Sequence, residues 1–174
     1  ILNSKLIDYL YRNIVQENGR VFPEVKKVVL GKMPIKNILL PEQEIFVNSV
    51  NQILLKSEVL HSKRKSFLHR LNINFDGIKI TETLSTFEQL EFADFLKELK
   101  KQKITLKLSQ QDEWEEYFND YRSACRQLSE QIAETDKEID LRVYKLYGLT
   151  YDEVLIVDAD FSVSRDEYDS YRLL

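Results

Sequence analysis

Residues 110–147, QQDEWEEYFNDYRSACRQLSEQIAETDKEIDLRVYKLY, contain neither glycine nor proline and carry large side chains at alternating intervals of four and three. That spacing places them on one side of an α-helix, and its repeat of seven is typical of helices that pack against another helix. The stretch therefore predicts a long helix that ends at Gly148. Its seam is Trp114, Phe118, Tyr121, Cys125, Leu128, Ile132, Thr135 and Ile139, and the apolar stripe then shifts to Val143 and Leu146.

A second seam with the same spacing lies earlier in the chain. Pro41, Glu42 and Glu44 favour a helix start, so we expect a helix over residues 42–70. Its seam is Phe46, Val50, Ile53, Ser57, Leu60, Arg64, Phe67 and Leu71. Two matched seams most simply fold back as an antiparallel pair within one molecule, although pairing between two molecules would use the same pattern.

The remaining segments predict shorter elements. A helix is expected over residues 1–16, started by Asn3 or Ser4, and another over 87–101 after a capping box of Thr86 and Gln89. Runs of β-branched and large apolar residues predict short strands centred on 25–30, at 103–108 and at 155–157. The expected fold is α+β but mostly α: a long, coiled-coil-like antiparallel helical hairpin with a small cap and a short β segment.

This pattern suggests three parts. Residues 1–40 would form one lobe, and residues 41–158 the hairpin, with the cap inserted at 72–109 between its arms. Residues 159–174 would be an acidic tail.

Composition limits the classes of function. The net charge of −4 is unlike that of a protein that coats nucleic acid with its whole surface, so any DNA contact must come from a local basic patch. Cys125 is the only cysteine, which excludes an internal disulfide and suits a cytoplasmic location. No apolar run approaches the roughly 20 residues that span a bilayer, so no membrane partner is expected.

Several stretches, in order, resemble one group of bacterial proteins. ILNSKLIDYLYRN (1–13) and GRVFPEVKKVVLGKMPI (19–35) resemble the end of a TaqI-like C-terminal specificity domain. FEQLEFADFLKELKKQKI (87–104) and QDEWEEYF (111–118) follow in the same order. The most specific stretch, EIDLRVYKLYGLTYDEVLIV (138–157), is similar to the closing helix of type IIG restriction–modification enzymes and related adenine-specific DNA methyltransferases.

The resemblance implies a non-catalytic C-terminal fragment of a restriction–modification enzyme. Such a fragment would contribute to recognition of double-stranded DNA and dock the specificity domain on the methyltransferase or nuclease part of the same polypeptide. The residues 1–40 would then be the distal edge of a truncated recognition lobe. The methyltransferase motif N-P-P-Y and a glycine-rich cofactor loop are absent from the sequence. The resemblance implies S-adenosylmethionine and Mg²⁺ as cofactors of the parent enzyme, and no cofactor is expected for this fragment.

Basic clusters are the best candidates for phosphate contacts, because lysine and arginine bind phosphates without reading sequence. One cluster lies near the end of the first long helix, one in the middle segment, and one in the part that resembles the recognition lobe. The candidate nucleic-acid-binding residues are Lys63, Arg64 and Lys65, then Lys100 and Lys101, then Arg12, Arg20, Lys26 and Lys27.

No catalytic or metal-binding residue is predicted. The triplets Glu24-Val25-Lys26 and Glu98-Leu99-Lys100 match half of a nuclease site but arise by chance in a chain so rich in charge. His61 and His69 are eight apart rather than the four typical of zinc ligands on a helix. Trp114, Tyr117, Phe118 and Tyr121 could stack bases, yet their seam spacing favours core packing. The alternative function is a coiled-coil oligomerisation or scaffold module without a DNA role.

Overall fold

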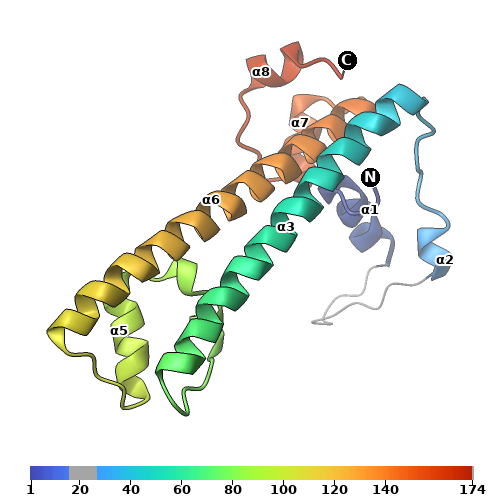
Figure 1. Cartoon of the computed structure of the whole chain (residues 1–174). Helices are drawn as coiled ribbons and strands as arrows, with labels where there is room; N and C mark the ends of the chain where they lie inside the picture. The colour runs from blue at the N-terminus through green and yellow to red at the C-terminus, as the bar shows by residue number, and fades with distance from the viewer. Residues whose placement is uncertain (16–26, 174) are drawn as a thin grey trace. The chain divides into compact units, whose positions relative to one another are not determined.

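The computed structural model describes residues 1–15 and 27–173, and every regular element in these ranges is a helix (Figure 1). The chain divides into two compact units: unit 1 comprises Ile1–Val50 and Thr135–Leu174, and unit 2 comprises Asn51–Glu134. The elements are α1 (Lys5–Val15), α2 (Lys27–Leu30), α3 (Leu40–Asn74), α4 (Glu82–Ser85), a 3-10 turn η1 (Phe87–Gln89), α5 (Phe92–Lys101), α6 (Leu108–Tyr147), α7 (Tyr151–Val157) and α8 (Arg165–Ser170).

In unit 2, the α3 and α6 segments pack in opposite directions. Three side-chain contacts show this, because the residue number on the α6 side falls as the number on the α3 side rises. The pairs are Lys63 with Tyr121, Phe67 with Tyr117, and Phe75 with Trp114. The antiparallel arrangement expected from the two seams is therefore present in this unit.

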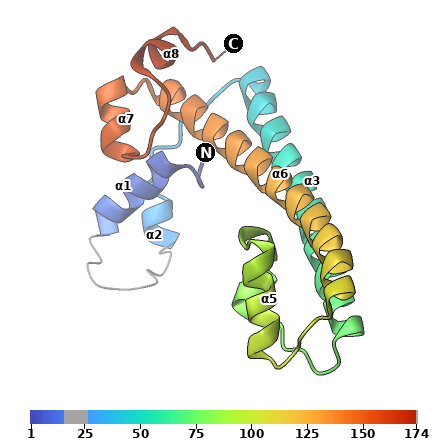
Figure 2. The ribbon, with the colours of Figure 1, turned by 90° about the vertical axis from the view of Figure 1, so that its left-hand side faces the viewer.

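The core of unit 2 centres on Phe67, which has no exposed surface. Its ring stacks on that of Phe87, with the centroids 3.7 Å apart. A fully buried side chain of this size contributes about 1.5–3 kcal/mol to folding. Helix α5 lies along the α3–α6 pair and closes the core (Figures 1 and 2). The other buried members are Leu60, Leu71, Leu84, Phe95, Leu99, Leu106, Phe118 and Cys125.

Unit 1 is built around the last turns of α6, where Val143 and Tyr144 are fully buried. Helix α1 lies beside α7 in this unit (Figure 2). Ser4 starts α1, because its hydroxyl accepts a 3.5 Å hydrogen bond from the backbone N–H of Ile7. The first part of α3 also belongs here, and its Ser49 hydroxyl accepts a 3.0 Å hydrogen bond from the Arg142 guanidinium.

The predicted β segment is wrong, because the described residues contain helices and no strand. Residues 27–30 form the single helical turn α2, which leaves Val28 exposed instead of paired in a sheet. Residues 104–107 form no regular element, after a left-handed backbone at Lys103 (φ 64°) ends the preceding turn. The α+β class is thus corrected to all-helical for the described part of the chain.

The strand expected at 155–157 is helix α7. Thr150 and Glu153 form a capping box, in which the Thr150 hydroxyl accepts from the Glu153 N–H and the Glu153 carboxylate accepts from the Thr150 N–H. A second capping box, formed by Ser164 and Glu167, starts α8 in the acidic tail. Local capping therefore outweighs the β-branched composition of this short segment.

The helix expected at 87–101 begins five residues later, at Phe92. Thr86 does not cap it: its hydroxyl donates instead to the Glu82 carbonyl, at 3.3 Å, and closes α4. Phe87 and the residues after it make the 3-10 turn η1, which carries the Phe87 ring into the core of unit 2.

Candidate nucleic-acid interface

The candidates near the N-terminus are only partly described by the structure. Arg12 is exposed on α1, and its Nε lies 2.8 Å from the Asp8 carboxylate one turn earlier. Lys27 opens α2, but its side chain is not described. Arg20 and Lys26 lie outside the described residues. Of this group, the structure therefore places only the Arg12 side chain.

The neighbours Lys63, Arg64 and Lys65 do not form one patch in unit 2, because α3 turns their side chains in different directions. Arg64 pairs with the carboxylate of Glu88, whose side chain is only 4% exposed. The Lys63 ammonium lies over the Tyr121 ring, 5.9 Å from its centroid. Lys65 alone of the three is exposed to solvent.

Lys65 instead belongs to a line of basic residues on α3. His61, Lys65 and His69 are spaced four residues apart, are all exposed, and so follow one another along one face of the helix. We call these three residues the basic line. It lies opposite the side that carries the buried Leu60, and it is confined to unit 2.

The lysines of α5 are mostly paired within their own helix. The Lys101 ammonium bonds to the Glu98 carboxylate, and the Lys97 ammonium lies 2.8 Å from the Asp94 carboxylate. The hydrogen bond to Asp94 raises the pKa of Lys97. Lys100 is exposed. The middle basic cluster thus offers less concentrated positive charge than its sequence suggests.

Helix α3 also exposes large apolar side chains on the side away from the unit 2 core. Leu54, Leu55 and Val59 are 61%, 65% and 47% exposed, and we call these three the apolar patch. In unit 1, the same helix exposes Leu40 and Val47. The heptad seam follows only one side of α3, so it does not predict the apolar patch. The signal was in the sequence: apolar residues occur on both sides of residues 45–60.

Among the side chains considered for chemistry, Cys125 lies in the core of unit 2. Cys125 is fully buried, and burial raises the pKa of its thiol, which disfavours the thiolate that a nucleophile requires. In the described ranges there is no group of three or more histidine, cysteine or acidic side chains that could hold a metal ion. Among the described helices, none is long and apolar enough to cross a membrane.

A buried polar cluster in unit 1 joins α1 to the end of α6 and the residue after α7. The Lys5 ammonium lies 2.9 Å from the Asp158 carboxylate, and this contact raises the pKa of Lys5. The Lys5 backbone N–H donates to Asp140 at 3.0 Å, while burial raises the pKa of that carboxyl group. Tyr144 donates to Asp158 at 3.3 Å. The cluster contains its own counter-charge, so we interpret it as structural.

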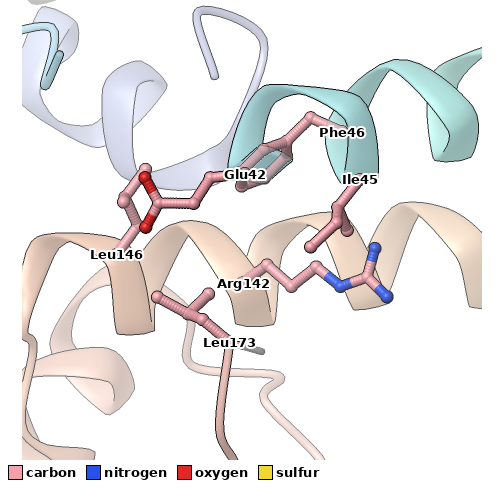
Figure 3. Close-up of a pocket in the computed structure, with 6 residues that line it drawn as sticks. All are labelled: Glu42, Ile45, Phe46, Arg142, Leu146 and Leu173. Carbon is pink, nitrogen blue, oxygen red and sulfur yellow. The ribbon is translucent and has the colours of Figure 1, made fainter. Parts of the chain in front are cut away.

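The C-terminal segment is held by Arg142 in unit 1. Its guanidinium donates to Ser49, to Glu138 and, at 3.1 Å, to the hydroxyl of Tyr171. Beside it, Leu173 closes a small apolar slot whose other walls come from α3 and α6 (Figure 3). Leu173 therefore forms one wall of this slot in unit 1.

A comparison with known proteins identifies one matching region. The family described as "Domain of unknown function (DUF8810)" matches residues 40–143, which is more than half of the 174 residues. The match begins at the first residue of α3 and includes all of unit 2, with the basic line and the apolar patch. No curated protein and no solved structure matches the chain.

Proposed function

We propose that this chain, which belongs to the family described as a domain of unknown function (DUF8810), is a non-catalytic helical module of a DNA restriction–modification protein. The module would dock on the methyltransferase or nuclease part of the same polypeptide and contact the phosphates of double-stranded DNA. The restriction–modification assignment rests on the sequence resemblance, chiefly that of residues 138–157. The two contacting surfaces rest on the geometry of α3 in unit 2.

The observation that carries the docking role is the apolar patch. A helix on the surface of a globular protein normally has one apolar stripe, which faces the core. In unit 2, α3 buries Leu60 and Phe67 on one side and still exposes Leu54 and Leu55 on the other. Large apolar side chains exposed on the side of a helix that faces away from the core are candidates for an interaction site.

The basic line supports the DNA contact. Phosphate contacts come mainly from cationic side chains that can approach the backbone from solvent, and the affinity they provide falls as salt rises. Lys65 is exposed between His61 and His69, whereas Arg64 is engaged by the buried Glu88. The proposal therefore shifts the contact from the sequence cluster 63–65 to one face of the helix.

Charge reversal tests the DNA contact. Lys65→Glu should weaken binding of a DNA duplex about equally for all sequences and reduce the slope of log affinity against log salt by roughly 1. Arg126→Glu is the matched control, because Arg126 is an exposed cation on the other long helix of unit 2. Both affinities can be measured by fluorescence anisotropy with a labelled duplex.

A gain of binding makes the test stricter. Glu58 is exposed on α3 one turn before His61, so Glu58→Lys should extend the basic line and strengthen salt-sensitive binding. If Lys65→Glu and Arg126→Glu weaken binding equally, or if Glu58→Lys leaves it unchanged, the contact does not lie on this face.

The same proposal assigns no chemistry to this chain. The methyl donor S-adenosylmethionine and Mg²⁺ would act elsewhere in the parent enzyme, and the location would be cytoplasmic, as the single buried thiol of Cys125 suggests. Methylation or cleavage of DNA by the chain alone would contradict this part of the proposal.

The alternative is an oligomerisation module, and the apolar patch favours it as a second candidate, since a second copy could cover the patch. Light scattering separates the two. A monomer at micromolar concentration supports docking on a different protein part. A dimer that Leu55→Glu dissociates without loss of helix content supports oligomerisation, because Leu55 contributes nothing to the core of unit 2.

A further inference from the structure

An open groove lies in unit 2 between the end of α3 and the beginning of α6. It is lined by Arg70, Asn74, Glu113, Trp114 and Tyr117. Arg70, Asn74 and Glu113 are exposed, whereas Trp114 and Tyr117 are half-buried. The groove thus combines two aromatic walls with one cation, one amide and one carboxylate.

The core of unit 2 holds the aromatic walls in place. Trp114 packs against Phe75 at a centroid distance of 5.1 Å and meets Tyr117 edge to face at 5.6 Å. The ring centroid of Tyr117 in turn lies 4.7 Å from that of Tyr121. Burial is the main cause that raises the pKa of Tyr117, followed by its side-chain hydrogen bond with Tyr121, while Arg70 acts in the opposite direction. The rings at the groove are therefore already ordered, and a ligand would not need to immobilise them.

The polar rim provides both kinds of hydrogen-bonding group. Asn74 donates one amide hydrogen to the Arg70 carbonyl at 2.9 Å, and its side-chain oxygen is an acceptor that this bond does not use. The Glu113 carboxylate accepts, and the Arg70 guanidinium donates. Aromatic side chains stack on any base, a guanidinium binds phosphate, and amide and carboxylate groups bond to base edges.

From this combination we propose that the groove binds the base of an unpaired nucleotide in single-stranded DNA, with Arg70 on its phosphate. Such a base would lie against Trp114 and Tyr117 and bond through its edge to both Asn74 and Glu113. Arg70 follows His69 directly in the sequence, so it projects from a different side of α3 than the basic line, and the groove is a separate site. The inference rests on the proposed DNA contact and specifies an unpaired strand as its ligand.

The test compares two single-stranded ten-residue DNA probes of equal charge: oligothymidylate and an abasic deoxyribose–phosphate strand. Trp114 is the only tryptophan, so its fluorescence reports on this groove. Oligothymidylate should quench it and bind about fivefold or more tightly than the abasic strand, since stacking of one base is worth that much. Equal affinity of the two probes would overturn the base site and leave the phosphate contact standing. Failure of both single-stranded probes to bind would overturn the groove as a nucleotide site, whereas the duplex measurements with Lys65→Glu decide the phosphate contact separately.

Matched variants locate the effect. Asn74→Ala and Glu113→Gln should each lower the preference for oligothymidylate over the abasic strand by about threefold or more, the value of one hydrogen bond. Asn72→Ala and Glu116→Gln are the controls: both residues are exposed, lie two or three positions away, and do not line the groove. A base preference that the Asn74 and Glu113 variants retain in full would place the base elsewhere.

Discussion

The ion pair between Arg64 and Glu88 joins α3 to the turn that precedes α5 in the interior of unit 2. Arg64 occupies a seam position, so its guanidinium is directed inwards, where Glu88 is the acid beside it. A buried charge is tolerated when it is paired, and removing one partner leaves the other uncompensated. Loss of one member of this pair should therefore destabilise unit 2 more than loss of both members.

Arg64→Met should destabilise unit 2 by about 3–5 kcal/mol, because it leaves the Glu88 carboxylate buried and unpaired. Arg64→Met combined with Glu88→Leu should recover most of that loss, since two apolar residues of similar volume replace the pair. Urea unfolding followed by Trp114 fluorescence measures both variants. A double variant no more stable than Arg64→Met would show that the loss comes from packing of the arginine stem.

Asp140 in unit 1 should give a pH dependence of the opposite sign to that of most surface carboxylates. Burial raises its pKa above the ordinary 3.8, so the folded state favours its protonated form. That stabilisation is complete below the unfolded pKa and is lost as the pH rises through the folded pKa. The unfolding free energy of the unsubstituted chain minus that of Asp140→Asn should therefore be smaller at about pH 7 than at about pH 3.

The amide introduced by Asp140→Asn would still present an oxygen to the Lys5 N–H, which makes the comparison isosteric. Urea unfolding followed by circular dichroism at the two pH values gives the difference. A difference that grows with pH would mean that attraction to Lys5 exceeds the cost of burying the charge.

Single residues show where sequence reasoning reaches its limit. Phe118 and Cys125 were predicted to be buried from their spacing alone, and both are. The DNA-binding assignments of Lys65 and Arg64 remain predictions. The structure differs for the two residues: Lys65 is exposed to solvent, whereas Arg64 pairs with the buried Glu88. Spacing determines which side of a helix a residue occupies. It does not reveal which acid from another element, here Glu88, lies opposite.

At the scale of elements, α7 and α8 depend on their caps because both helices are short. Thr150→Ala removes the side-chain acceptor for the Glu153 N–H and should lower the stability of unit 1 by about 0.5–2 kcal/mol. Ser162→Ala is the control, since Ser162 is exposed and lies outside any helix. Circular dichroism during urea unfolding measures both. Equal effects would mean that tertiary packing of Val154, and not the cap, maintains α7.

The two long helices could be predicted because their period of seven extends over many turns, and a long signal averages out local exceptions. The short elements could not. Leu155, Ile156 and Val157 favour strand by composition, yet a strand needs a partner strand, and the described residues provide none. The groove beside Trp114 was likewise unpredictable, since it depends on how the ends of α3 and α6 meet.

At the scale of the whole molecule, the chain has two cores, one around Phe67 in unit 2 and one around Tyr144 in unit 1. Local opening follows such cores, because each is a cooperative set of contacts. Arg64→Met should therefore speed amide hydrogen exchange mainly in residues 51–134, and Thr150→Ala mainly around α7. Mass spectrometry of peptide fragments measures the exchange rate separately in these two regions. A uniform increase across the chain for either variant would mean that the units unfold as one.

The only tryptophan and the only cysteine, Trp114 and Cys125, both lie in unit 2. Indole emission and thiol labelling therefore provide no optical or chemical signal from the other half of the molecule. A fluorescence melting curve would record one transition even if unit 1 had already unfolded. Unit 1 becomes visible only to backbone methods or through an added reporter, for which Tyr151, a half-buried aromatic beside Phe161, is a suitable position for a Trp substitution.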